Sequence, residues 1–303
     1  MPRSPSASLT SYSDKRLVSA SAVTTSRPRT VQAANEQVVT DQPIKRSKSR
    51  LSLGWLGWIL PIALLGFAEV AAHVGWVQAR LLPPPSEIAQ TLSVLVDQGL
   101  FGHIAASSTR VLSGYAIGAI LAVGFGLLVG LSRHAEAFFE PTFQALRAIP
   151  SLAWVPLLLL WFGIDETPKI TLIAIGAFFP IYLGLVSGIR NVDRKLIELG
   201  EMYGLSSLTL ARRIVLPAAL PSLFTGLRNG LSLAWMFLVA AELIAATRGI
   251  GYLLTDGRET SRPDVVLAAI LLLAILGKLT DSLLKWLEVR KLAWSDSLAT
   301  RSV

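Results

Sequence analysis

The sequence contains no cysteine and few charges. Of its 303 residues only 16% are charged, whereas 52% are hydrophobic and the mean hydropathy is +0.55. The absence of cysteine excludes disulfides and thiolate metal ligands. A soluble protein of this size needs far more charged surface, and several nearly charge-free runs approach the ~20 residues that cross a bilayer. The composition therefore predicts an integral, all-α polytopic membrane protein.

Motifs for catalysis and for metal binding are also scarce. The fragment nearest to a phosphate-binding loop, Gly277-Lys278-Leu279, lacks the leading glycine spacing and the hydroxyl residue that would hold magnesium. There is no HExxH motif, the three histidines lie in separate segments, and Asp281 has no second aspartate suited to protease chemistry. No repeat of the two halves is evident, which argues against a secondary transporter. We expect a chain without enzyme activity, metal or cofactor.

Positive charge is concentrated near the N-terminus. The first fifty residues carry nine Lys and Arg against three acids, are rich in Ser and Thr, and show no periodicity. We predict a disordered basic tail over residues 1–50, with no cleaved leader because the first apolar core lies too far from Met1. Beside a membrane span, the basic run at its end is expected to hold the cytoplasmic side rather than to bind nucleic acid; it comprises Lys45, Arg46, Lys48 and Arg50.

Apolar runs predict six membrane spans, at residues 53–74, 109–131, 145–163, 169–189, 223–246 and 265–287. Placing the N-terminus inside puts most Lys and Arg in cytoplasmic segments, among them Arg133, Arg147, Arg190, Arg194, Lys195, Arg212, Arg213, Arg290 and Lys291. Both termini are therefore predicted to be cytoplasmic, with a C-terminal tail at 290–303. Residues 51–108 would hold the first span and a short external helix, which Ser86 would cap after Pro83–Pro85.

Small residues and prolines mark the packing of three spans. In the second span small residues recur every four positions: Gly114, Gly118, Ala122, Gly126 and Gly130. This stripe allows close approach of another helix, either within the subunit, which we favour, or across a dimer. Spans three and four contain Pro150, Pro156 and Pro180, which free backbone carbonyls and predict that both helices face protein or a water-lined cavity.

Three residues are candidates for lining a translocation pathway. Trp154 and Trp161 lie seven residues apart on one predicted face of span three, and Glu242 lies near the outer end of span five. Ordinary packing is the alternative for each tryptophan, and a structural interfacial carboxylate is the alternative for Glu242. At the inner end of span six, a ladder of ion pairs is predicted among Lys278, Asp281 and Lys285.

The loop at 190–222 predicts two short helices outside the bilayer. Asn191 or Asp193 would cap the first helix, which ends where Gly204 takes a left-handed conformation. The second would run from Ser207 to Val215, with Ser206 as its cap, and end before Pro217. Pro221 would then open span five. Such an element suits docking to a partner, and an amphipathic connector is the alternative.

This loop carries a resemblance to a known family. The spacing of Glu198, Gly204, Ile214, Leu216 and Pro217 resembles the EAA loop of ABC importer permeases, E-A-A-x3-G-x9-I-x-L-P, with Leu199-Gly200 in place of the two alanines. From about Leu53 to Trp294 the chain is similar to permeases for aliphatic sulfonates, taurine and nitrate. The matching stretches are LLPPPSEI, IPSLAWVPLLLLWFGIDE, FPIY, GIRNVDR, AAELI, GIGYLL and DVVLAAILLLAILGKLTD, and several look closest to the aliphatic sulfonate branch.

The resemblance implies the six-helix type I ABC importer permease fold, with its core at 109–289, in the bacterial inner membrane. It implies three partners: a cytoplasmic ABC ATPase dimer that binds ATP and magnesium, a periplasmic or extracellular substrate-binding protein, and a second permease subunit, expected to be a copy of this chain. Residues implied to couple to the ATPase are Glu198, Gly204, Leu205, Ser206, Ser207, Leu208, Arg212, Ile214 and Pro217.

The implied substrate is a small organosulfur anion, most closely an aliphatic sulfonate. A permease for taurine, nitrate or a pyrimidine precursor is the alternative within the same class. An ion-coupled secondary transporter that uses Glu242 and a membrane scaffold without transport activity are alternatives from other classes.

Overall fold

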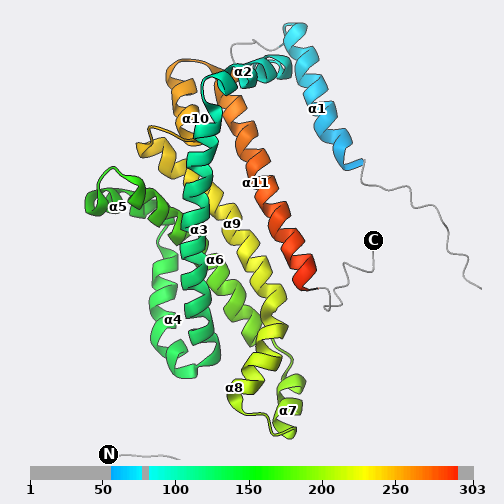
Figure 1. The fold of residues 1–303 in the computed structure, drawn as a ribbon, viewed down its shortest axis with the longest axis vertical. Helices are drawn as coiled ribbons and strands as arrows, with labels where there is room; N and C mark the ends of the chain where they lie inside the picture. The colour runs from blue at the N-terminus through cyan, green and yellow to red at the C-terminus, as the bar shows by residue number, and fades with distance from the viewer. Residues whose placement is uncertain (1–55, 77–81, 293–303) are drawn as a thin grey trace, which may run out of the picture. The chain divides into compact units, whose positions relative to one another are not determined.

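The structure is a computed structural model that describes residues 56–76 and 82–292, and within these ranges it is helical and contains no strand (Figure 1). Four helices are long and apolar enough to cross a membrane: α3 (Leu100–Leu131), α6 (Glu166–Arg190), the continuous helix Ser207–Ile244 and α11 (Pro263–Lys291). These spans confirm the all-α polytopic membrane class. The predicted tail at 1–50 and nearly all of that at 290–303 lie outside the described residues.

The first two helices, α1 (Leu56–His73) and α2 (Pro85–Asp97), are joined by hydrogen bonds. α1 lies within the first predicted span, whose opening residues are not described. α2 is the predicted short helix, but the prediction that Ser86 caps it is wrong, because the helix begins at Pro85. Instead, the Ser86 hydroxyl donates to Oε1 of Glu69 at 2.7 Å and thereby ties α2 to α1.

α3 packs against α6 along the small-residue stripe. A Cβ atom on Gly118 would lie 2.6 Å from the carbonyl oxygen of Ala174, and one on Gly130 would lie 2.5 Å from Cδ1 of Ile189. At Gly118 the obstacle is backbone, so only glycine fits; at Gly130 it is the end of a flexible side chain, which would have to move. The stripe is therefore a contact within the subunit, as favoured from the sequence.

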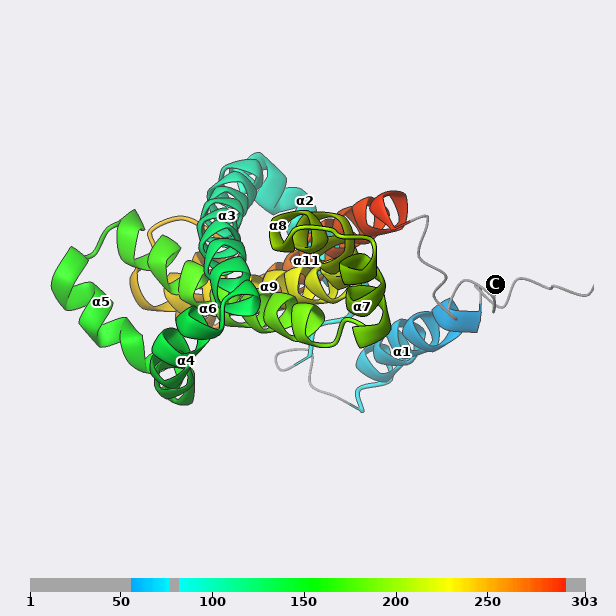
Figure 2. The same cartoon turned by 90° about the horizontal axis from the view of Figure 1, so that it is seen from below.

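α6 lies between α3 and α9 (Leu216–Ala245) and forms the centre of the core (Figure 2). At its crossing with α9, a Cβ atom on Gly184 would lie 2.8 Å from the Cα atom of Gly226, so the two backbones touch. The side chains of Ile181 and Tyr182 on α6 and Leu238 on α9 are fully buried. Two close contacts, one on either side, thus hold α6 in place.

The third predicted span is not one helix. α4 (Arg133–Ala148) and the pair formed by η2 (Ser151–Trp154) and α5 (Val155–Phe162) meet at 88°. The prediction of a single span at 145–163 is therefore wrong. Pro150 lacks an N–H donor and disfavours helix at the residue before it, and Ile149 accordingly has extended dihedrals of φ −77° and ψ 122°. Because α4 begins directly after α3 ends, the break falls deep within the helical layer rather than at its surface.

The helix that contains α9 begins earlier than predicted. α8 (Ser207–Leu210) continues through a π-helical turn, η3 (Ala211–Val215), into α9, so that Pro217 does not end one helix and Pro221 does not begin another. The wider π turn directly before Pro217 relieves the crowding that its ring causes in a regular helix. After α9, α10 (Ile250–Glu259) packs against α11.

Candidate functional site

The predicted docking element is a hairpin of α7 (Arg194–Met202), α8 and η3, which we call the 194–215 hairpin. Asp193 caps α7, as its carboxylate accepts a 2.9 Å hydrogen bond from the N–H of Lys195. At the other end of α7, Gly204 has φ +70° and its N–H donates a hydrogen bond to the carbonyl oxygen of Glu201. The N–H of Leu205 donates to the carbonyl oxygen of Gly200. This pair of bonds is the Schellman motif, so the predicted left-handed turn at Gly204, which ends α7, is confirmed.

The departure from the EAA pattern at Gly200 has a structural counterpart. Gly200 is buried where α7 crosses the second half of the hairpin. A Cβ atom there would lie 2.9 Å from Cδ1 of Ile214 and 3.0 Å from Cδ1 of Leu210. Both atoms end flexible side chains. The glycine thus permits a closer approach of the two helices than an alanine would allow without side-chain rearrangement.

The hairpin is buried at its base and exposed at its tip. At the base Val215 and Ala219 pack in one cluster with Leu185 and Ile189 of α6. At the tip Met202 and Tyr203 are each 83% exposed and Leu208 is 81% exposed. Of the other predicted coupling residues, Leu205, Ile214 and Pro217 are half-buried, and Glu198, Gly204, Ser206, Ser207 and Arg212 are exposed. The 194–215 hairpin is therefore anchored to α6 at its base and exposes three large apolar side chains at its tip.

An ion cluster lies near the other end of the spans, centred on the buried Arg110 of α3; Glu242 and Lys169 are also buried, and Glu166 is 49% exposed. Its guanidinium is 2.7 Å from Oε1 of Glu242 on α9 and 2.7 Å from Oε1 of Glu166 at the start of α6. Lys169 lies 3.1 Å from the same oxygen of Glu166. Two cations and two anions thus join three helices, and their charges balance.

The surroundings of Glu242 are those of a structural carboxylate. Its residue exposure is 1%, and it accepts hydrogen bonds from the Ser107 hydroxyl at 2.8 Å and from the Gly251 N–H at 2.7 Å. Glu242 was singled out in the sequence, but its partner Arg110 was not. The sequence feature that could have indicated Arg110 as the partner is its position as a lone arginine at the edge of an apolar run.

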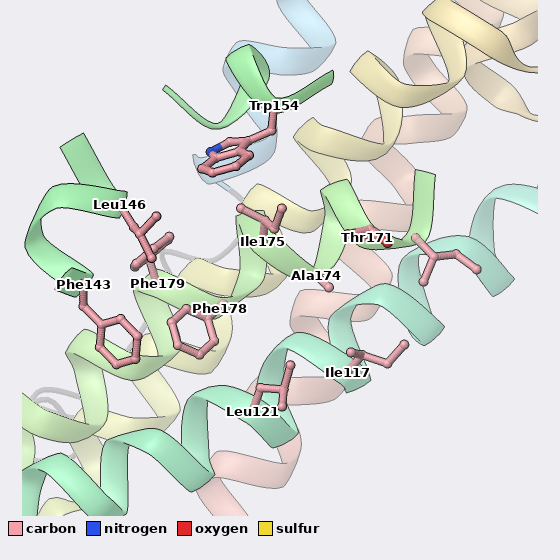
Figure 3. Close-up of a pocket in the computed structure, with 11 residues that line it drawn as sticks. Ile117, Leu121, Phe143, Leu146, Trp154, Thr171, Ala174, Ile175, Phe178 and Phe179 are labelled. Atoms are coloured by element: carbon pink, nitrogen blue, oxygen red, sulfur yellow. The ribbon is translucent and has the colours of Figure 1, made fainter. Parts of the chain in front are cut away.

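The second pathway candidate, Trp154, lines a cavity of about 360 Å³. Figure 3 shows its indole facing side chains of α4 and α6, including Leu146 and Ile175. Trp161 is 62% exposed on α5 and is not among the lining residues. The lining is almost entirely apolar, and its other members are Ile117, Leu121, Phe143, Ile170, Thr171, Ala174, Phe178 and Phe179. This cavity suits hydrocarbon rather than an anion.

A polar cleft of about 460 Å³ lies between α6 and α9 and was not predicted. Its polar lining consists of Ser187 on α6 and of Ser222, Thr225 and Asn229 on α9. The last three are spaced i, i+3 and i+7, which places them on one helical face. Thr225 and Asn229 are exposed although they lie within the apolar spans. The sequence feature that could have predicted the cleft is this short polar face inside a predicted span.

The predicted ion-pair ladder on α11 is wrong. Asp281 instead pairs with Arg228 of α9 at 2.9 Å, and Arg228 also lies 3.5 Å from Glu288. The interhelical pair replaces the ladder because α9 packs directly against α11 and brings a guanidinium, which binds a carboxylate better than a lysine does.

Several apolar spans around a central helix, with an exposed hairpin beyond them, define a polytopic membrane protein with a candidate docking element. Residues 114–292 match the family described as the binding-protein-dependent transport system inner membrane component, and the chain belongs to this family. It is accordingly a multi-pass protein of the bacterial inner membrane.

Individual relatives agree. The chain is 40% identical over 258 residues to SsuC of Bacillus subtilis, which is named an aliphatic sulfonates transport permease protein, and the match covers 84% of this chain and 94% of that protein. SsuC of Escherichia coli is 45% identical, with 78% and 91% covered. The taurine transport system permease TauC of Escherichia coli is 35% identical, with 76% and 88% covered.

A solved structure shows the same fold. A chain of the MetNI methionine ABC transporter, in an inward-facing conformation, superimposes with a TM-score of 0.50 at 20% identity. The superposition covers 65% of this chain and 96% of that chain.

Proposed function

We propose that the chain is the permease subunit of an ATP-driven importer that moves a small organosulfur anion, an alkanesulfonate, across the inner membrane. The family description supports an importer that depends on a binding protein. The relatives named for aliphatic sulfonate and taurine transport support the substrate class, since both names denote compounds with a sulfonate group on an aliphatic carbon.

The observation that carries the proposal is the exposed tip of the 194–215 hairpin. Three large apolar side chains, each more than four-fifths exposed, are costly in water and are typical of a docking surface. In this proposal they enter a groove of a cytoplasmic ABC ATPase dimer. That partner binds ATP and magnesium, which fits the lack of a phosphate loop in this sequence.

The continuity of α8 with α9 supports mechanical coupling. The helix Ser207–Ile244 runs for 38 residues from the tip of the hairpin through the core. A displacement of Leu208 by the ATPase is therefore transmitted along one helix, and the packed base at Val215 carries it to α6. Closure of the ATPase dimer would move α6 and α9 together and change which side of the membrane the pathway faces.

A second permease subunit, a copy of this chain, completes the proposed pathway. The polar face of α9 is exposed in a region of apolar composition, and such a face is expected to meet water or protein rather than lipid. A substrate-binding protein would deliver the anion from outside.

The surroundings of Glu242 do not support the rival ion-coupled mechanism. A proton-coupling carboxylate must exchange protons with water during each cycle, but the side chain of Glu242 has no exposed surface and its charge is paired with Arg110. Nothing in residues 56–76 or 82–292 favours the scaffold alternative.

The proposal is tested by placing a charge on the tip. In Leu208→Asp and Gly204→Asp, we expect normal membrane insertion but loss of ATPase co-purification and of ATP-dependent alkanesulfonate uptake. Val289→Asp is the matched control, because Val289 is a 63% exposed apolar residue of α11 away from the hairpin. Full transport by Leu208→Asp would refute the docking role.

A further inference from the structure

An unpaired arginine lies deep within the helical layer. Arg147 is on the last turn of α4, directly before the break at Pro150. Its side chain is exposed, and it forms no hydrogen bond or ion pair with any residue in 56–76 or 82–292. From the sequence it was assigned to the cytoplasmic side, and the position of α4 changes this.

Contacts between α4 and α6 fix the depth of Arg147. Near the inner end of α6, Arg190 pairs with Glu136 at 2.9 Å. One turn further along α4, the Tyr182 hydroxyl donates to Glu140 at 3.0 Å. Near the end of α4, Arg147 and Glu140 border a cavity of about 10 Å³ that is also lined by residues of α6, the deepest of which is Phe179.

Phe179 stands near the middle of α6. It is eleven residues from Arg190, which corresponds to about 16 Å of helix, and thirteen residues from Glu166, which corresponds to about 20 Å. The hydrocarbon core of a bilayer is about 30 Å thick. Arg147 therefore lies close to the membrane midplane, too deep for its side chain to reach the inner interface easily.

A guanidinium at this depth is unfavourable against lipid, so its position indicates a water-filled pathway or a bound anion. The neighbourhood agrees. Leu183 borders both the small cavity beside Arg147 and the polar cleft, which continues towards the inner end with Ser187, Ser222, Thr225 and Asn229. Gln144 lies on the same side of α4 as Arg147. Cation, amides and hydroxyls thus follow one another along α4, α6 and α9. The carboxylate of Glu140 borders the same small cavity, but it accepts a hydrogen bond from Tyr182 at 3.0 Å and lies 3.7 Å from Arg190.

We propose that Arg147 binds the anionic headgroup of the substrate at mid-membrane, and that the polar cleft receives this headgroup on its way to the cytoplasm. The proposal rests on the proposed import function and adds the residue that recognises the charge. A guanidinium offers two parallel N–H donors to two oxygens of a sulfonate, whereas the neutral donors of the cleft bind more weakly and allow release. The adjacent apolar cavity at Trp154 would accept the alkyl chain, since Phe179 borders both cavities.

The first test measures uptake of radiolabelled ethanesulfonate by the complete importer in proteoliposomes. For Arg147→Ala we expect uptake to fall by about tenfold or more, with intermediate uptake for Arg147→Lys. ATP hydrolysis stimulated by the binding protein should persist in both variants. The matched control is Arg133→Ala, which removes an exposed arginine from the first turn of the same helix and should leave uptake unchanged.

Two outcomes of this test would overturn the inference. One is uptake at the wild-type rate in Arg147→Ala, and the other is loss of stimulated hydrolysis together with uptake in both Arg147 variants, which would indicate a role in folding or coupling. If the wild-type importer itself shows no ATP-dependent uptake, the proposed function fails instead.

A second test does not depend on transport. Because the sequence has no cysteine, single cysteines can be labelled without background. Arg147→Cys should react with a hydrophilic, membrane-impermeant thiol reagent, and ethanesulfonate should slow the reaction. Ile120→Cys is the control, because Ile120 is a 72% exposed apolar residue at a similar distance from the inner end of α3, and it should stay unlabelled. Failure of Arg147→Cys to react would overturn the inference on its own.

Discussion

Nη1 of Arg110 lies 2.7 Å from Oε1 of Glu242, so that a buried ion pair joins α3 to α9 across 132 positions of sequence. The side chain of Glu242 has 0% exposure and that of Arg110 has 8%. The pair is also linked to the N-terminus of α10, since Glu242 accepts from the Gly251 N–H. This contact fixes the ends of three helices, so its removal should lower the free energy of unfolding of the whole bundle.

The first prediction concerns this pair. Glu242→Gln removes the charge but keeps the shape, and it leaves Arg110 with Glu166 as its remaining anionic partner. We expect a loss of about 3 kcal/mol and a melting temperature in detergent lower by about 5–10 °C. Glu259→Gln, at an exposed carboxylate of α10, is the control and should melt like the wild type. An unchanged melting temperature for Glu242→Gln would show that the pair is dispensable.

The second prediction compares two glycines of α3. A Cβ atom on Gly118 would lie 2.6 Å from a backbone oxygen of α6, whereas one on Gly124 meets nothing within 4 Å. Gly118→Ala should therefore destabilise by about 1–3 kcal/mol because the helices must separate. Gly124→Ala should be neutral or stabilising by up to about 1 kcal/mol, since alanine favours helix. Thermal unfolding of both variants measures the difference, and equal melting temperatures would contradict the close α3–α6 contact.

The third prediction concerns the crossing inside the hairpin. Because the atoms nearest to a Cβ on Gly200 end the flexible side chains of Ile214 and Leu210, Gly200→Ala should be tolerated and should bind the ATPase normally. Gly200→Leu cannot be accommodated in this way and should displace α7 from η3. We expect co-purification of the ATPase to fall in Gly200→Leu. If Gly200→Leu retained the ATPase, the hairpin would not need this packing for docking.

The fourth prediction is the orientation of the chain. Ser207 and Glu259 are both exposed, on α8 and at the end of α10 respectively. An impermeant thiol reagent added to intact cells or spheroplasts should label Glu259→Cys and should label Ser207→Cys only after the membrane is opened. Labelling of Ser207→Cys from outside would reverse the topology.

Local patterns predicted much of this structure. The glycine period in α3 showed a close contact because only small residues permit one, and the Gly204 turn followed from its preference for positive φ. Apolar runs located four of the six predicted spans, because their length must match the bilayer. The third predicted span is a bent helix pair, and the described apolar helix in the first, Ile59–His73, is shorter than a span. These features are each encoded within one segment of the chain.

The features that sequence did not predict depend on contacts between distant segments. The partner of Glu242 lies on another helix, and its identity depends on how α3 rotates against α9. The sequence marked Pro150 as disturbing a helix, but only the fold shows the 88° bend there. The depth of Arg147 likewise depends on contacts of α4 with α6. The prediction that Pro217 ends a helix is wrong, because the π-helical turn before it lets the helix continue.

The central claim is that ATP hydrolysis by a partner, transmitted through the 194–215 hairpin, drives import through this chain. It is tested most directly in proteoliposomes that contain the permease, its ATPase and the binding protein, with ethanesulfonate uptake measured under three energy sources. We predict uptake with ATP, none with a proton or sodium gradient alone, and none with ATP in Leu208→Asp. Uptake driven by an ion gradient without the ATPase would contradict the account.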